Sequence, residues 1–478
     1  MDGGSESEKK GISGFSRVVF WPFRHWRWLI VGLVCLLAIY VVIDQLLTKK
    51  LAGQLDRLRE EGRPTTFAEM GVGTLPPSEN AALVYRSAAR SMKTALSGHE
   101  QLRERFVDMT TCPRHRTDDD GDYTPFSEAE LRTIEAHIQA LEPALATVLE
   151  ARTLPGCEFG NYAILSGAAT NASAVLPDLA DVREIARNLA YKAAWEAEQG
   201  NTDEALKWVA ANMRLANDLT GDPLLITGLV RVAVASIAID SLERILHDRE
   251  LPENVPEELY AELAGLCDRK NAARFVDGER CFVASHAANP RVGYFARVFY
   301  YSPGRADINE ITSTLANALE EEDYARRCEL MAHLEAYKAP SPSQQSPLTM
   351  KKRGARGLFG GFTAPWNMMA KMTAPALVSA GEAFERHIAA AHLARIALAI
   401  KAFHRDTGTY PDSLSRLVPE FLGTLPPDPF SGNDFIYRAD ETGFLLYSVG
   451  PDLNDDGGMP FDNFQGDIVW CGGLHEGP

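Results

Sequence analysis

The chain has 478 residues and a formal net charge of −17, from 48 Lys and Arg against 65 Asp and Glu. This balance argues against nucleic acid as a partner, because a phosphate-binding surface needs a basic patch. The length allows two or three domains beside a membrane span. The seven cysteines form no Cys-x-x-Cys pair and no zinc-ligand spacing, which argues against a metal finger or a disulfide scaffold.

Residues 28–47 form an apolar run, WLIVGLVCLLAIYVVIDQLL, whose first charge is Asp44. A helix needs about twenty such residues to cross a bilayer, and aromatic residues crowd the entry side, as at membrane interfaces. The alternative is a cleavable signal peptide, but no small-x-small cleavage site follows the run. Basic residues flank both ends, so the charge bias is weak. We expect a cytoplasmic tail at 1–27, a single-pass membrane anchor at 28–47 and the bulk of the chain outside the cytoplasm.

A mixed juxtamembrane region is expected at 48–126, with a polar helix at 51–61, a loop at 71–77 and a helix at 80–96. Its acidic run 118–122, DDDGD, has the composition of a cation site. The glycine comes one place early for a calcium loop, however, and no later ligand is evident. A solvated acidic loop is the preferred interpretation.

Breakers become sparse after Ser127, which predicts an all-α domain at 127–337. Ser127 and Glu130 form a capping box at its start. The hairpin around Gly200 resembles a tetratricopeptide-type repeat, although one legible unit is fewer than the roughly three that a stack needs. Helices are expected at 127–152, 177–199, 203–219, 223–247, 257–267 and 308–337.

The helix at 223–247 is apolar enough to be considered as a second membrane span. Arg231 lies within it, and an unpaired charge at the centre of a bilayer is costly. A buried helix of the all-α domain is therefore the preferred interpretation.

A linker is predicted at 338–374, where SPSQQSP precedes Lys351-Lys352-Arg353 and a glycine-rich stretch. The basic cluster could contact anionic lipid, but a solvated linker is the preferred interpretation. The last domain, 375–478, begins with a long helix that carries one apolar stripe and ends near Gly408. A short helix at 412–418 and strands at 435–438, 444–449 and 468–470 follow. This order predicts an α+β unit, with the long helix packed on a small antiparallel sheet.

The loop before the last strand reads Asp452-Leu453-Asn454-Asp455-Asp456-Gly457-Gly458. Oxygen-bearing side chains at alternate positions, followed by a glycine, form the opening half of a calcium loop. The usual closing glutamate is replaced by Asn463, so later aspartates would have to complete the shell. A solvated acidic turn is the alternative. We predict a structural Ca²⁺ ion, and its candidate ligands are Asp452, Asn454, Asp456, Asp462 and Asp467.

Several short motifs of this last domain occur in a distinctive order. They are Gly408-Thr409-Tyr410-Pro411, Asp428-Pro429-Phe430-Ser431-Gly432, Tyr437, Ser448 to Asp452, and Asp467-Ile468. Together they resemble the globular part of the major pseudopilin of type II secretion systems, over about a fifth of the chain. The resemblance implies a helix-on-sheet fold and a structural calcium ion with Asp452 and Asp467 as side-chain ligands. The N-terminus departs from that family, because Gly14-Phe15 imitates its cleavage site but the fifth residue is Val19 instead of Glu.

Catalytic motifs are absent from the sequence: it contains no His-Glu-x-x-His, no Gly-x-Ser-x-Gly and no P-loop. His387 and His392 are five residues apart on the long helix, too far around it to share a metal. We expect a non-enzymatic, membrane-anchored envelope protein whose helical domain binds other envelope proteins. One alternative is an accessory component of a type II secretion or pilus-like machine. Another is a hydrolase whose active site is assembled from scattered residues.

Overall fold

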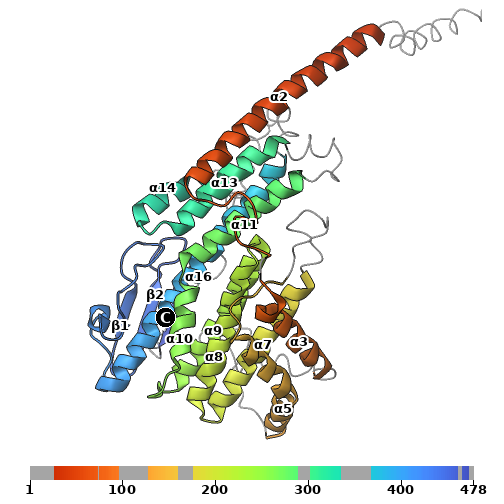
Figure 1. Cartoon of the computed structure of the whole chain (residues 1–478). Coiled ribbons are helices and arrows are strands. Elements are labelled where there is room, and N and C mark those ends of the chain that lie inside the picture. Colours follow the sequence, from red (N-terminus) through yellow and green to blue (C-terminus); the bar gives the residue numbers. More distant parts are fainter. Residues whose placement is uncertain are drawn as a thin grey trace, which may run out of the picture.

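The computed structural model describes residues 26–73, 75–95, 128–159, 176–288, 302–334, 368–460 and 466–472. Within these ranges the chain is mainly helical, with a small three-stranded antiparallel sheet near the C-terminus (Figure 1). This confirms the coarse fold class expected from the sequence. The acidic run 118–122, Ser127 of the capping box and the basic cluster 351–353 lie outside the described residues.

The N-terminal part of the described chain is one continuous helix, α2 (Trp26–Glu60). It merges the two helices expected at 28–47 and 51–61, because no glycine pair or proline separates them. Figure 1 shows its first half projecting away from the rest of the molecule, while its second half packs along α13 (Ser302–Glu320).

The helical body is built from neighbouring helices that pack in pairs. In the α7–α8 hairpin, Gly200 adopts a φ of 83°, and the Asn201 N–H donates to the Glu196 carbonyl, which closes the end of α7. Such a conformation favours glycine. The helices of this part are α3 (Ala81–Ala95), α5 (Glu128–Ala151), α7 (Leu176–Glu198), α8 (Thr202–Asp218), α9 (Leu225–Asp248) and α10 (Glu257–Leu266).

Two features of the body differ from the sequence-based expectation. The helix expected at 308–337 is two helices, α13 and α14 (Tyr324–Leu334), because Asp323 caps a new start by accepting a 2.7 Å hydrogen bond from the Arg326 N–H. The helix α11 (Arg269–Ala288) was not expected. Its apolar periodicity is interrupted by charged residues, and two of these, Asp277 and Arg280, are buried in ion pairs.

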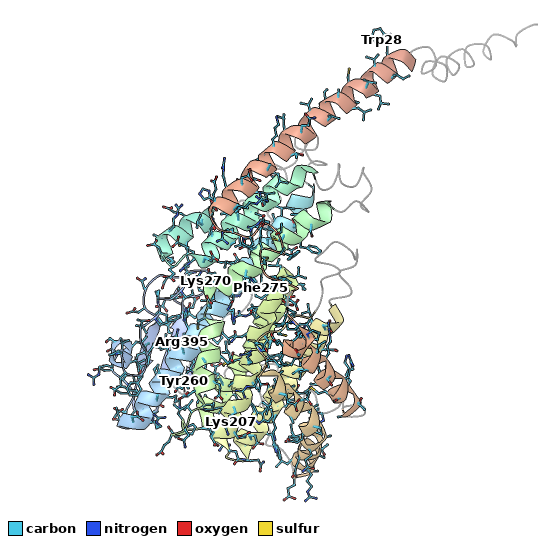
Figure 2. The ribbon with its side chains drawn as sticks, in the orientation of Figure 1. Trp28, Lys207, Tyr260, Lys270, Phe275 and Arg395 are labelled. Atoms are coloured by element: carbon cyan, nitrogen blue, oxygen red, sulfur yellow. The ribbon has the colours of Figure 1, made fainter. Side chains whose placement is uncertain are left out.

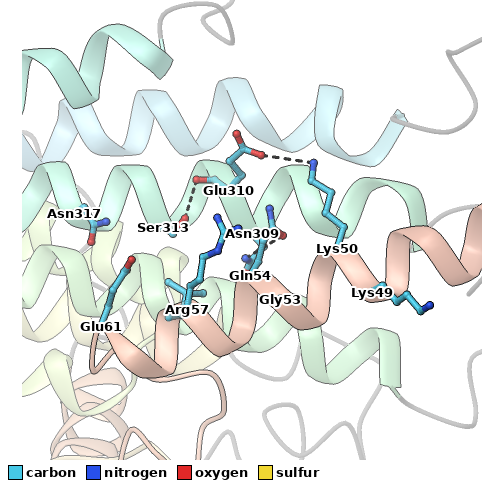
Figure 3. A pocket seen from close by; sticks show the side chains of 11 residues that line it. Lys49, Lys50, Gly53, Gln54, Arg57, Glu61, Asn309, Glu310, Ser313 and Asn317 are labelled. Carbon is cyan, nitrogen blue, oxygen red and sulfur yellow. Dashed lines mark hydrogen bonds and ion pairs between the residues drawn. The ribbon is translucent and has the colours of Figure 1, made fainter.

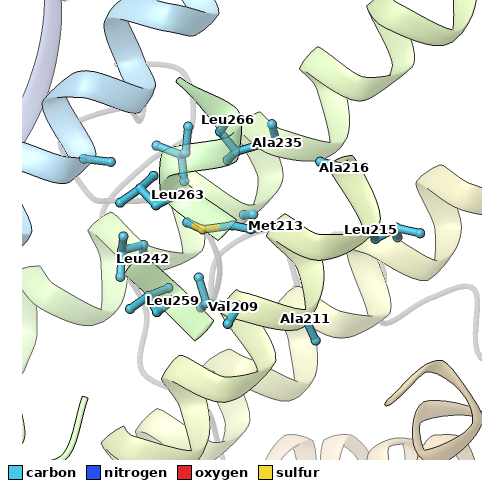
Figure 4. Packing of buried hydrophobic residues seen from close by; sticks show 14 of the residues in the cluster. Val209, Ala211, Met213, Leu215, Ala216, Ala235, Leu242, Leu259, Leu263 and Leu266 are labelled. Atoms are coloured by element: carbon cyan, nitrogen blue, oxygen red, sulfur yellow. The ribbon is translucent and has the colours of Figure 1, made fainter. Parts of the chain in front are cut away.

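The longest helix, α16 (Met368–Thr407), joins the terminal sheet to the helical body. It starts before the expected position and has Pro375 inside it, so residues 368–374 of the predicted linker are helical; residues 338–367 lie outside the described ranges. Its side chains belong to a continuous hydrophobic cluster that also includes residues of α7 to α10 and of the sheet (Figure 4). Figure 4 shows Val209, Met213, Leu242 and Leu263 meeting in that cluster.

The sheet has the order β1-β2-β3, with β1 (Ile436–Ala439), β2 (Phe444–Ser448) and β3 (Ile468–Gly472) all antiparallel to their neighbours. All three strands lie where the sequence predicts them. The short helix expected at 412–418 is a 3₁₀ turn, η10 (Leu414–Leu417). Every residue of β2 is buried, and α16 packs against β2 and β3, so the terminal unit is a helix laid on a sheet.

Candidate functional site

The projecting half of α2 exposes an unusual amount of apolar surface. Trp28 at its tip is 74% exposed (Figure 2). Leu36 is 66% exposed. Apolar residues occur on all sides of this helix instead of on one stripe, which is typical of a membrane span or of a fully buried helix. The exposed apolar residues are Trp28, Ile30, Val31, Leu33, Val34, Leu36, Leu37, Ile39, Val41, Val42 and Leu46.

Among the described residues, one helical stretch is long and apolar enough to cross a membrane by length and composition, Leu225–His247 of α9. A core helix of a soluble protein passes the same test, and 56% of its most apolar stretch is buried. Arg231 within it is buried, and its guanidinium donates to the Asn217 side chain at 3.2 Å and the Gly265 carbonyl at 3.0 Å. In α2 a shorter apolar stretch, Ile30–Ile39, lies inside the predicted span.

The base of the candidate calcium loop is organised by Asp428, a buried carboxylate. Its Oδ1 accepts hydrogen bonds from the Ser448 hydroxyl at 2.7 Å and the Phe430 N–H at 3.0 Å, and its Oδ2 accepts from the Ser431 hydroxyl at 3.1 Å. Asp428 therefore ties the bend that follows it to the end of β2. Both motifs are evident in the sequence, but the role of this carboxylate is not; an Asp directly before Pro-x-x-Gly was the available signal.

Two of the predicted calcium ligands close the loop on itself. The Asp452 Oδ2 accepts a 3.2 Å hydrogen bond from the Gly466 N–H, and the Asp467 Oδ2 accepts a 2.7 Å bond from the Gly458 N–H. Asp467 is completely buried, and its Oδ1 has no hydrogen-bond partner within the described residues. A buried carboxylate oxygen without a partner is costly, and a cation is one of the few groups that can satisfy it.

The other predicted ligands are placed differently. Asn454 and Asp456 are exposed on the loop, and Asp462 lies outside the described residues. Asp455, which was not among the predicted ligands, accepts hydrogen bonds from the Tyr447 hydroxyl at 2.8 Å and the Gly457 N–H at 3.0 Å. No group of three His, Cys, Asp or Glu side chains in the described part of the chain is close enough together to hold a metal ion.

The electrostatics of the loop nevertheless suit a hard cation. Burial raises the pKa of Asp467, the N–H groups of Gly458 and Asp456 lower it in part, and the nearby carboxylates of Asp455 and Asp456 raise it. Calcium would relieve this repulsion and supply a partner for the free Asp467 oxygen. Ca²⁺ takes about six to eight oxygen ligands, many of which can be backbone carbonyls. Asp452, Asp467 and loop carbonyls are therefore the groups that would hold a calcium ion, and this ligand set stays a prediction.

The two histidines of α16 are core residues. Burial lowers the pKa of His387 to about 3, and the nearby Arg231 lowers it further; burial also lowers the pKa of His392 to about 3. The His387 Nε2 lies 3.3 Å from an Arg231 guanidinium nitrogen. Both imidazoles are therefore neutral at physiological pH and serve the packing of α16.

A second group of buried ionisable residues lies where α8 meets the segment after α5. The Asp218 carboxylate accepts hydrogen bonds from the Tyr85 hydroxyl and from Arg214, both at 2.7 Å. Nearby, Asp222 accepts a 2.8 Å bond from the Phe159 N–H. Burial raises the pKa of Asp218 to about 6 and that of Asp222 to about 7. The sequence offered no signal for this cluster, because its members are far apart along the chain.

No family model, no curated protein and no solved structure matches this chain. The resemblance of the last domain to pseudopilins therefore stays a prediction from its motifs.

Proposed function

We propose that this chain is a single-pass membrane protein of the cell envelope without catalytic activity. In this proposal the helical body serves as a scaffold for other envelope proteins, and calcium stabilises the pseudopilin-like terminal unit. The observation that carries the proposal is the exposed apolar half of α2, which leaves the body and is apolar on every side. In water such an exposed apolar surface would favour aggregation. A bilayer would bury this surface and so stabilise the protein.

Two native cysteines allow this topology to be tested without adding new ones. Cys35 lies on the exposed apolar half of α2, and Cys328 is exposed on α14. In intact cells a membrane-impermeant maleimide should label Cys328 and leave Cys35 unlabelled, and alkaline carbonate should not extract the protein. The test uses a background in which Cys112 and Cys471 are replaced by serine, and Cys328→Ser in that background is the matched control, because it should abolish the labelling. Extraction by carbonate, or labelling of Cys35 in intact cells, would refute the anchor.

The calcium part of the proposal predicts that the full chain melts at a higher temperature in calcium than in a chelator. An ion that binds only the folded loop raises stability by mass action. Asp452→Ala should remove most of this increase while changing the melting temperature in chelator only slightly. Asp440→Ala is the control, because Asp440 is an exposed carboxylate that caps the β1–β2 turn away from the loop. An equal loss in calcium and in chelator would rule Asp452 out as a ligand.

The alternative role, as an accessory component of a secretion or pilus-like machine, is favoured by two apolar side chains beside the same loop. Leu453 and Met459 are both highly exposed, and Leu453 has a φ of 62°, which is uncommon for a residue with a branched side chain. Cross-linking from position 453 in living cells should then capture pilin-like or secretion proteins. Loss of the cross-link in a chelator would connect this contact to the calcium loop.

A further inference from the structure

A hollow of about 530 Å³ lies between α2 and α13, at the point where the exposed apolar part of α2 ends (Figure 3). Its α2 side begins at Lys49, just after the apolar run. Because a helix rises about 1.5 Å per residue, Lys49 to Gln54 lie roughly 3 to 10 Å beyond that run. The headgroup layer of a bilayer extends roughly 5–8 Å beyond the hydrocarbon core. In the anchored protein the hollow therefore opens at the depth of the lipid headgroups.

The lining of the hollow carries more positive than negative charge. Lys49, Lys50 and Arg57 line it together with two carboxylates, Glu61 and Glu310. Lys50 forms an ion pair with Glu310 at 3.8 Å, and both side chains are exposed, so this pair contributes little to stability. Within the described residues, no carboxylate pairs with Lys49 or Arg57. The hollow therefore favours an anion.

The direction of the side chains suits a ligand that comes from the membrane. Side chains on a helix lean toward its N-terminus, so Arg57 on α2 leans back toward the bilayer. Figure 3 shows Arg57 and Lys50 extending from α2 toward α13, whereas the Lys49 side chain points away from α13.

Two amide side chains add hydrogen-bond donors to the lining. The Gln54 oxygen accepts a 3.4 Å bond from the Asn309 NH₂, and the Asn317 oxygen accepts a 2.5 Å bond from the Arg63 Nε. Because both oxygens are already used, each amide presents its NH₂ group as a donor. Cations combined with N–H donors are the groups that bind phosphate oxygens most strongly.

The α2 wall of the hollow is open at Gly53. A Cβ atom built on this residue would meet no other atom within 4 Å, and its φ is not in the left-handed region. A larger side chain can therefore occupy the space beside Gly53 without strain in the helix. Glycine in the interior of a helix costs about 0.5–1 kcal/mol relative to alanine, which is consistent with a role for the open space.

We propose that this hollow binds the phosphate group of an anionic phospholipid from the leaflet at the C-terminal end of the α2 span. Arg57 contacts the phosphate, the Gln54 amide donates a hydrogen bond to one of its oxygens, and the acyl chains lie along the apolar surface of α2. The inference rests on the proposed membrane anchor. A lipid fits better than free phosphate, because the hollow is continuous with the exposed apolar run.

The test uses the full chain reconstituted in nanodiscs of phosphatidylcholine, with and without phosphatidylglycerol. After gentle delipidation, native mass spectrometry measures which lipid stays bound. The parent should retain phosphatidylglycerol in preference to phosphatidylcholine. Arg57→Gln should weaken this retention by about tenfold or more, the effect of losing one charge-assisted hydrogen bond. Gly53→Leu should weaken it by filling the hollow, whereas Gly53→Ala should retain it. Unchanged melting curves show that the variants fold.

Each outcome decides one question. Equal retention of the two lipids by the parent, or undiminished retention by both Arg57→Gln and Gly53→Leu, would overturn the headgroup site. If inorganic phosphate displaces phosphatidylglycerol completely from the solubilised protein, the hollow binds free phosphate, and the proposal that its ligand is a lipid is wrong. Flotation with vesicles of both compositions is measured in parallel. A parent protein that does not float refutes the membrane anchor itself, whereas one that floats without lipid preference refutes only the headgroup site.

Discussion

Two helices of this protein, α2 and α9, carry long apolar runs, but their surroundings differ. The apolar side chains of α2 are exposed on all sides, whereas α9 packs against α7, α8, α11 and α16 and encloses a buried arginine. By sequence both runs are long and apolar enough to be considered as membrane spans, and α9 passes such a test although it carries Arg231. The comparison teaches that the partners of an apolar helix, more than its composition, indicate which solvent it belongs in.

The largest expected effect tests this contrast with the same substitution in both helices. A Cβ atom on Gly228 of α9 would lie 2.6 Å from the Phe275 ring and 2.9 Å from the Phe384 ring, whereas one on Gly32 of α2 would meet nothing within 4 Å. Gly228→Val should therefore lower the free energy of unfolding by about 3 kcal/mol or more. Gly32→Val should leave the unfolding of the body unchanged. Urea titration of both variants measures this, and a similar loss in each would mean that α2 is packed like α9.

Changing the charge of each helix should affect membrane integration only when the helix is α2. Leu36→Arg puts a cation at the centre of the proposed span, which costs about 3 kcal/mol of insertion free energy. We expect this variant to shift from the carbonate-resistant fraction to the soluble or aggregated fraction. Arg231→Leu removes the charge from α9 and should leave membrane integration unchanged while lowering the stability of the body. If Arg231→Leu alone changed the membrane fraction, α9 would be the span.

The smallest expected effect is a change in the free energy of unfolding with pH. We expect it to arise beside α9 and not in α2. Asp222 lies three residues before α9, and burial raises its pKa from 3.8 to about 7. Because the folded state holds this proton more tightly than the unfolded chain does, the contribution of Asp222 to stability falls as pH rises from about 4 through 7. Asp222→Asn removes this dependence and keeps an acceptor for the Phe159 N–H.

The advantage of Asp222→Asn over the parent should therefore grow by on the order of 2 kcal/mol between about pH 5 and pH 8. Urea midpoints at several pH values measure it, and flotation of the parent with vesicles should not change over the same range. A constant difference between the two proteins at all pH values would mean that the Asp222 carboxyl titrates normally.

The sequence predicted the elements whose signals are local. Gly408 ends α16 with a φ of 76°, and all three strands lie within a residue or two of the expected positions. The α7–α8 hairpin follows from a glycine and an asparagine between two apolar patterns. Such features depend on backbone preferences and on periodic burial, which can be read without knowledge of the partners.

Features that depend on distant residues could not be predicted in the same way. The helix α11 carries charges that look solvated in the sequence, yet Asp277 pairs with Arg63, three residues after the end of α2. The role of Asp428 depends on Ser448, which is twenty residues away. Of the candidate calcium ligands, Asp452 and Asp467 belong to one closed loop, whereas the alternate spacing of Asn454 and Asp456 leaves both exposed. The ligand set as a whole stays a prediction from spacing.

The bend from Asp428 to Gly432 also contacts α14. The Tyr324 hydroxyl donates to the Phe430 carbonyl at 2.7 Å, Arg327 donates to the Pro429 carbonyl at 3.1 Å, and any side chain on Gly432 would collide with the Tyr324 ring. Through α14 and α13 this bend is linked to the foot of α2. A force on the terminal unit would therefore reach α2 through α14 and α13, and if α2 is the membrane anchor that we propose, tension on the loop would be transmitted to the bilayer.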